Sequence, residues 1–197
     1  MADSNARIEL RSYVLQSISQ SAEVIAALKD QIETIDRIAQ CITERLLSGH
    51  KLLTAGNGGS AAEAMHLAQE STGKYSRADR KPLAAICLCA DATALTCIGN
   101  DWDFASVFSR QVEALAKPGD MLVVFSSSGN SENLIRACSA IKAAGGLAIG
   151  LLGKGGGRNL PLCDMALVIP SQRTACIQEA QQVVLHLILE YIDRLCP

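Results

Sequence analysis

Short apolar runs alternate with helix-like segments along most of the chain, and this alternation constrains the fold more than any other feature. The runs lie at residues 52–55, 84–89, 121–125, 147–152 and 165–169. Segments with helical spacing of apolar residues lie at 60–71, 104–116, 131–144 and 174–194. Strands that alternate with helices form βαβ units, so the pattern predicts an α/β fold with a mostly parallel sheet.

The N-terminal part of the chain has a different character. Residues 7–48 contain neither proline nor glycine and show helical spacing of apolar residues, which predicts two helices with a bend near Ser19 to Ser21. No linker or repeat divides the chain. We therefore expect residues 1–197 to form a single domain, with 1–49 as a helical arm suited to oligomerisation and 50–197 as the α/β core.

Composition narrows the class of protein. The chain has 197 residues, of which 49% are apolar and 19% charged, below the roughly 25% charged share of an average soluble protein. This predicts that much surface is buried against copies of the chain. A formal charge of −2 gives no electrostatic reason to expect nucleic acid as a partner.

Apolar segments and cysteines indicate the cellular compartment in which we expect the protein. The first residues lack the apolar core of a signal peptide, and no run approaches the about 18 apolar residues of a membrane span, so we expect a cytoplasmic protein without a membrane partner. The eight cysteines lie partly inside predicted strands and helices. In a chain of this size that favours free thiols in a reducing compartment over a disulfide framework.

A serine-rich loop follows the third apolar run. Residues 121–125 lead into Ser126-Ser127-Ser128-Gly129-Asn130-Ser131, which predicts a buried strand, a tight turn and a helix that opens near Ser131. Such a junction directs free backbone N–H groups and the positive end of a helix dipole at one point, which suits an anion such as phosphate. The alternative is an ordinary turn in which Ser131 caps the helix.

A glycine loop, Gly56-Asn57-Gly58-Gly59, follows the first apolar run. Ser60 and Glu63 have the spacing of a capping box, so we expect the next helix to begin at Ser60. The loop also matches the glycine spacing of the dinucleotide fingerprint. That fingerprint requires an acidic residue about 20 positions further on, and the second strand ends about ten residues too late, so a sugar- or phosphate-contacting loop is favoured over an NAD site.

Two predicted helices carry polar residues at helical spacing. His66 and Glu70 share one helix face, and Gln178, Gln182 and His186 form a polar ladder on the last helix. One interpretation is a surface pair and a hydrogen-bonded core histidine. If the two helices converge, these side chains offer a ligand set for a divalent metal such as zinc, and equally a base and an acid.

Five motifs, taken in order, resemble the phosphoheptose isomerases of the sugar isomerase (SIS) superfamily. They are residues 53–60, Ala64-Met-His66 with Glu70, Ile98-Gly-Asn100-Asp101, Ser126 to Ser131, and Ile177-Gln178-Glu179 with His186. The resemblance covers nearly the whole chain. It implies a five-stranded parallel sheet flanked by helices in a flavodoxin-like three-layer sandwich, and a homotetramer with active sites shared between subunits.

The implied reaction converts sedoheptulose 7-phosphate to D-glycero-D-manno-heptose 7-phosphate through an enediol or enediolate. It is the first step toward bacterial heptose, including that of lipopolysaccharide. Glu70 would act as the base and His186 as the partner acid. The implied zinc ligands, for one ion per subunit, are His66, Glu70, Gln178 and His186. The implied phosphate contacts are Ser126, Ser127, Ser128 and Ser131, and the implied sugar contacts are Asn57, Gly58, Gly59, Ser60, Asn100, Asp101 and Gln178.

Two positions depart from the pattern. Lys74 stands where the resemblance leads us to expect arginine, and lysine lacks the bidentate geometry of arginine. Cys176 stands where the resemblance leads us to expect a basic residue. Two alternatives remain: a non-catalytic SIS tetramer that binds a replication initiator protein, and another SIS aldose–ketose isomerase. The complete His66, Glu70, Gln178 and His186 set favours an enzyme over the first, and substrate length is not readable from the sequence.

Overall fold

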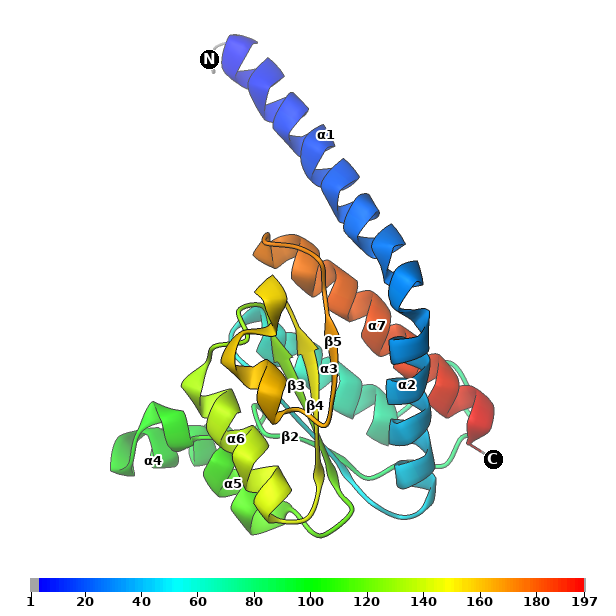
Figure 1. The fold of residues 1–197 in the computed structure, drawn as a ribbon, viewed down its shortest axis with the longest axis vertical. Coiled ribbons are helices and arrows are strands. Elements are labelled where there is room, and N and C mark those ends of the chain that lie inside the picture. Colours follow the sequence, from blue (N-terminus) through cyan, green and yellow to red (C-terminus); the bar gives the residue numbers. More distant parts are fainter. Residues whose placement is uncertain (1–3, 197) are drawn as a thin grey trace.

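A five-stranded sheet forms the centre of the molecule (Figure 1). The structure, a computed structural model, describes residues 4–196. All strands run parallel in the order β2-β1-β3-β4-β5. The strands are β1 (Leu52–Gly56), β2 (Ala85–Cys87), β3 (Met121–Ser126), β4 (Leu147–Leu152) and β5 (Met165–Val168). The predicted α/β class with five parallel strands is thereby confirmed.

Helices cover both faces of the sheet, which gives the predicted three layers. On one face lie α2 (Ile32–Leu47), α3 (Gly59–Thr72) and α7 (Thr174–Leu195), and on the other lie α4 (Ala92–Asp101), α5 (Ser109–Leu115) and α6 (Glu132–Ala143). In β3, Val123 and Phe125 point into the first layer, while Leu122 and Val124 point into the second. Because both faces are buried, the central strands are continuously apolar rather than alternating.

The N-terminal arm consists of α1 (Ser4–Ala26), a short 3-10 segment η1 (Ala27–Gln31) and α2. The predicted bend near Ser19 to Ser21 is wrong: α1 runs through these residues, and the Ser21 hydroxyl donates to the Ser17 carbonyl at 3.0 Å. A serine that bonds back to the preceding turn can remain within a helix. The break falls instead at η1, where the side-chain amide of its last residue, Gln31, donates to the Val168 carbonyl at 3.2 Å.

Helix α1 extends away from the rest of the molecule (Figure 1). Its apolar side chains lie largely in solvent, although monomeric proteins rarely expose so many together. Five of them are about six-tenths exposed: Ile8, Leu10, Tyr13, Leu15 and Ile18.

Helix α4 and the 3-10 segment η3 (Lys154–Leu162) lie outside the predicted elements. Helix α4 begins after Asp91, whose carboxylate accepts from the backbone N–H groups of Thr93 and Ala94, a standard helix N-cap. The glycine-rich η3 connects β4 to β5. The predicted helix at 104–116 is divided into η2 (Phe104–Ser106) and α5.

Within residues 4–196, no helix is both long enough and apolar enough to cross a membrane. The eight cysteines are free thiols. Cys176 is buried and its sulfur lies 3.7 Å from the Ser21 hydroxyl, so this departure from the family pattern is accommodated as a packed side chain under α1.

Candidate functional site

The glycine and serine loops leave adjacent parallel strands at the same edge of the sheet. Gly56 at the end of β1 pairs in register with Phe125 near the end of β3. The side-chain amides of Asn57 and Asn133 exchange two hydrogen bonds of 2.9 Å, which ties the glycine loop to the first turn of α6. A pocket of about 80 Å³ lies between the loops. Its lining residues are Asn57, Ser60, Phe125, Ser126, Ser127, Ser128 and Ser131.

The serine loop presents donors to this pocket. The Ser126 and Ser128 hydroxyls accept from the backbone N–H groups of Gly129 and Asn130, at 3.0 and 3.2 Å, which leaves their own protons available. Ser131 occupies the N-cap position of α6, but its hydroxyl makes no cap bond within the described chain. The Leu134 N–H donates to the Ser131 carbonyl at 3.1 Å, so the N–H groups of Glu132 and Asn133 are the ones that α6 offers to an anion.

The predicted capping box of Ser60 and Glu63 is wrong. Helix α3 begins at Gly59, with Gly58 at the N-cap in a left-handed conformation (φ +57°), and no side chain caps it. A glycine adopts this conformation at little cost, so the backbone rather than a Ser60–Glu63 exchange sets the helix start. Glu63 is buried, which raises its pKa to about 7 even though hydrogen bonding by Ser60 opposes the shift.

Gly59 also allows α7 to approach the loop. A Cβ built on this residue would overlap the Gln178 side-chain amide. The same amide reaches the Ser60 hydroxyl, with Nε2 and Oγ 3.5 Å apart. Gln178 on α7 is thus joined to the rim of the small pocket, and it is half-buried there.

The structure brings the polar side chains of α3 and α7 together. His66 Nε2 lies 3.5 Å from Glu70 Oε1. The Gln182 amide nitrogen lies between the two imidazoles, 2.7 Å from His66 Nδ1 and 3.2 Å from His186 Nε2. The ring centroids of His66 and His186 are 5.2 Å apart and the rings are nearly perpendicular. The two helices therefore converge, as the metal and acid–base interpretations require.

Two residues in this cluster were not assigned a site role from sequence. The sequence pattern indicates only that Gln182 belongs to the polar ladder, although its spacing from Gln178 and His186 places it on their face. The Tyr75 ring stacks on His186 at 5.8 Å with an interplanar angle of 27°, and nothing in its local sequence marks it. Burial, together with the neighbouring His66, lowers the pKa of His186, which favours neutral imidazole at neutral pH.

The donors of this cluster are suited to zinc. Glu70 Oε2 is buried and has no hydrogen-bond partner among residues 4–196, which leaves a strong acceptor available for a cation. Two ligands of one tetrahedral zinc ion lie roughly 3.4 Å apart, close to the separation of His66 Nε2 and Glu70 Oε1. In the part of the chain that the structure describes, no three His, Cys, Asp or Glu side chains already converge on one point as a metal would require.

The other predicted contacts lie elsewhere. Asn100 and Asp101 are exposed at the end of α4, where the Asn100 amide donates to Asp101 at 2.7 Å, and neither lines the small pocket. Lys74 is exposed after the end of α3. A single chain therefore unites the two loops and the α3–α7 cluster, and it leaves the predicted Asn100 and Asp101 contacts apart.

Comparison with known proteins agrees with this geometry. A family model described as the SIS domain matches residues 16–153, so the class of protein is a SIS domain. A phosphoheptose isomerase of Campylobacter concisus is 41% identical over 93% of this chain and 97% of its own length. One from Campylobacter jejuni is 46% identical over 90% of this chain and 92% of its length.

The solved structure of a Neisseria gonorrhoeae phosphoheptose isomerase has a TM-score of 0.88 and 38% identity to this chain, with coverage of 94% of this chain and 100% of that one. The chain therefore belongs to the SIS domain family and, within it, to the phosphoheptose isomerases.

Proposed function

We propose that this protein is an aldose–ketose isomerase that converts sedoheptulose 7-phosphate to D-glycero-D-manno-heptose 7-phosphate. The observation that carries the proposal is the convergence of α3 and α7, which joins His66, Glu70 and His186 in one cluster. Gln178 links this cluster to the serine-lined pocket through its contact with Ser60. One site thus combines an anion pocket with groups able to move protons.

The phosphate group would occupy the pocket between the two loops. The Ser127 and Ser131 hydroxyls line it, and the opening N–H groups of α6 supply the positive end of a helix dipole. Anchoring one end of a flexible sugar phosphate lets binding energy orient the reacting carbons at the other end. Asn57 lines the pocket, and Gly58 and Gly59 follow it in the glycine loop, along which a sugar chain leaving the pocket would pass.

The reaction moves a carbonyl from C2 to C1. Glu70 would take a proton from C1, with the electron pair of that C–H bond forming the enediolate, and would return a proton to C2. His186 would transfer a proton between the two oxygens or act as the partner acid. Gln182 and Tyr75 would hold the imidazole of His186 in position.

We propose one zinc ion per subunit at this cluster, held by His66, Glu70, Gln178 and His186. The unpartnered Glu70 Oε2 and the imidazole–carboxylate donor set support it. When bound, zinc would polarise the substrate carbonyl and stabilise the negative charge of the enediolate. Rotation of the Gln182 amide would let its oxygen accept from His66 Nδ1, which would leave the lone pair of His66 Nε2 for the metal.

We also propose a cytoplasmic homotetramer with shared active sites, which takes part in the synthesis of bacterial heptose, including that of lipopolysaccharide. The exposed apolar side chains of α1 support assembly. A shared site would further explain the position of Asn100 and Asp101, since a neighbouring subunit could supply them. Neither nucleic acid nor a membrane is proposed as a partner.

The test is to incubate the purified protein with sedoheptulose 7-phosphate and follow aldose formation before chelation, after chelation and after the return of zinc. Turnover that falls with chelator and recovers with zinc supports both the isomerase and the metal. Turnover indifferent to chelator retains the isomerase and removes the metal from it.

A folded tetramer without turnover in the presence of zinc would contradict the proposal and favour the non-catalytic SIS tetramer. Parallel assays with pentose and hexose phosphates test the remaining alternative, and faster turnover of either would reassign the substrate.

A further inference from the structure

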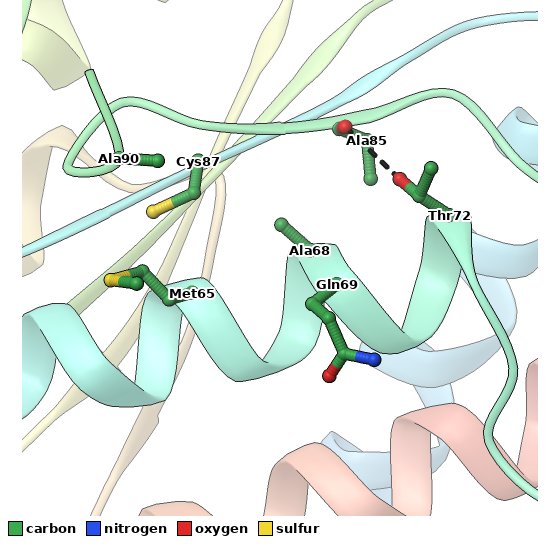
Figure 2. Close-up of a pocket in the computed structure, with 7 residues that line it drawn as sticks. All are labelled: Met65, Ala68, Gln69, Thr72, Ala85, Cys87 and Ala90. Atoms are coloured by element: carbon green, nitrogen blue, oxygen red, sulfur yellow. Dashed lines mark hydrogen bonds between the residues drawn. The ribbon is translucent and has the colours of Figure 1, made fainter.

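A second pocket lies beside the site, between β2 and α3. It has a volume of about 260 Å³ and is shown in Figure 2 with its lining residues Met65, Ala68, Gln69, Thr72, Ala85, Cys87 and Ala90. The Cys87 side chain projects from the end of β2 toward Met65 of α3 (Figure 2). The thiol of Cys87 therefore faces an opening through which a small solute can enter.

A second cysteine lies in the turn that begins at Cys87. The backbone N–H of Ala90 donates to the Cys87 carbonyl at 3.2 Å and closes a four-residue turn. Within it, the backbone N–H of Cys89 donates to Cys87 Sγ at 3.4 Å. The turn shortens the distance between Cys87 and Cys89 relative to extended chain, toward the roughly 4.4–6.8 Å Cα separation that a disulfide spans.

The pKa values of the two thiols are shifted in opposite directions. Contact with the Cys89 side chain, aided by the Cys89 backbone N–H, lowers the pKa of Cys87 to about 6 against the opposing effect of burial. The same contact and burial raise the pKa of Cys89. The lowered pKa favours the thiolate of Cys87, the form in which cysteine is nucleophilic, and the raised pKa favours the neutral thiol of Cys89 next to it.

We propose that Cys87 is a site of oxidation by hydroperoxides and that Cys89 closes a disulfide with it. The Cys87 thiolate attacks the terminal peroxide oxygen, the O–O bond breaks, and the departing oxygen takes a proton to leave as water or an alcohol. The sulfenic acid formed on Cys87 is then attacked by the Cys89 sulfur, which loses its proton as the S–S bond forms and water leaves. The two thiols lose two electrons and the hydroperoxide gains them.

The disulfide would alter the neighbouring loop. Cys89 Sγ now donates to the Gly56 carbonyl at 3.2 Å, and Gly56 directly precedes Asn57, Gly58 and Gly59. Once Cys89 Sγ is bonded to Cys87, it has no proton to donate, and the glycine loop loses this support. A disulfide across a single intervening residue is also strained, which makes it readily reduced by cellular thiols.

The first experiment detects the disulfide directly. The protein is treated with hydrogen peroxide near neutral pH, unfolded in N-ethylmaleimide and digested with a protease that cleaves before aspartate. Cleavage before Asp79 and Asp91 yields a peptide of residues 79–90 that contains Cys87 and Cys89 alone, and places Cys97 in the following peptide. We expect peptide 79–90 to become two hydrogens lighter and to lose both maleimide groups, with full recovery after dithiothreitol.

Variants separate the two roles. Cys89→Ser should stop the reaction at the sulfenic acid, so dimedone labels Cys87 in that variant and not in the parent. Cys87→Ser should leave Cys89 reduced at the same peroxide dose. Cys97, an exposed thiol on α4 whose pKa is raised by its contact with Asp101, is the internal control. At about pH 6.5, iodoacetamide should modify Cys87 more than about tenfold faster than Cys97.

Faster alkylation of Cys97, or a doubly alkylated peptide 79–90 at a peroxide dose that oxidises Cys97, would overturn the proposal. These measurements do not depend on catalysis.

A reversible rise in KM for the sugar phosphate on oxidation, absent in Cys89→Ser, is a further expectation that rests on the proposed function. Disulfide formation without turnover of any sugar phosphate would reject that function and retain the oxidation site.

Discussion

The guanidinium of Arg80 and the carboxylate of Asp193 form a buried ion pair, with Nε and Oδ1 2.8 Å apart, that joins the segment after α3 to the end of α7. Both side chains are almost fully shielded from solvent. The remaining Arg80 nitrogens donate to the backbone carbonyls of Glu70, Ser71, Gly73 and Lys81. Arg80 thereby fixes the last turn of the helix that carries His66 and Glu70 against the helix that carries Gln182 and His186.

Replacing Arg80 should therefore destabilise the protein strongly. Arg80→Leu leaves the Asp193 carboxylate buried without its ion-pair partner and removes four backbone interactions, so we expect a loss of about 3–5 kcal/mol in the free energy of unfolding. The measurement is urea unfolding followed by circular dichroism. Arg110→Leu, which removes a cation contact with the exposed ring of Trp102, is the matched control and should cost about 1 kcal/mol or less. Equal losses in the two variants would contradict the role of Arg80.

Glu63 should make stability depend on pH. Its folded pKa of about 7 lies above the ordinary value of 4.5, so between these pH values the folded protein retains a proton that the unfolded chain has lost. The stability contributed by this proton is complete below about pH 4.5 and is lost as pH rises to about 7. In Glu63→Gln the proton is no longer involved, so its Tm relative to the parent should rise across this window and then level off. Exposed Glu113→Gln should show a constant offset, and a constant offset in Glu63→Gln would refute the assignment.

Ser128→Ala should weaken binding of the sugar phosphate. The Ser128 hydroxyl lines the small pocket while accepting from the Asn130 N–H, so its proton remains available to an acceptor in the pocket. Loss of one hydrogen bond to a charged group corresponds to about a tenfold rise in KM. Steady-state kinetics provide the measurement, and Ser139→Ala on the exposed side of α6 is the control. Unchanged KM and kcat in Ser128→Ala would exclude this hydroxyl from phosphate binding.

Glu70→Gln should abolish turnover while the fold and the assembly are retained. Glutamine has nearly the shape of glutamate but cannot accept a proton from carbon, so we expect kcat to fall by a factor of about 10² to 10⁴. Aldose formation is measured beside circular dichroism and size-exclusion chromatography. Exposed Glu44→Gln on α2 controls for the loss of one negative charge. Near-parental turnover in Glu70→Gln would remove this carboxylate from the role of base.

The sheet could be predicted because its signal is local. Each strand buried on both faces is an apolar run, and β4 has the predicted limits at Leu147 and Leu152. Helix α4 was missed because its small and polar residues form no apolar stripe, with Ile98 its one buried side chain. The capping carboxylate of Asp91 was the available signal. Apolar spacing indicates two helices but not where the first one ends, and Ser21 bonds within α1, so the break falls at η1 and not near Ser19 to Ser21.

The candidate site was predictable only as separate parts. Local sequence grouped the serines of one loop, the glycines of another and the His66–Glu70 pair. The approach of Gln182 to both imidazoles depends on how α3 and α7 pack, which periodicity does not specify. Tyr75 lies in the irregular segment between α3 and β2, and its stacking on His186 is set by tertiary structure. Whether Asn100 and Asp101 contact the sugar stays a prediction.

The close fit of Gly59 against Gln178 also restricts how this sequence can evolve. A single methyl group on Gly59 would displace the Gln178 amide, which is the flexible end of its side chain. Displacing the amide gives up its contact with the Ser60 hydroxyl. A substitution at Gly59 therefore acts through Gln178, and selection on the link between α7 and the glycine loop also constrains the residue at position 59.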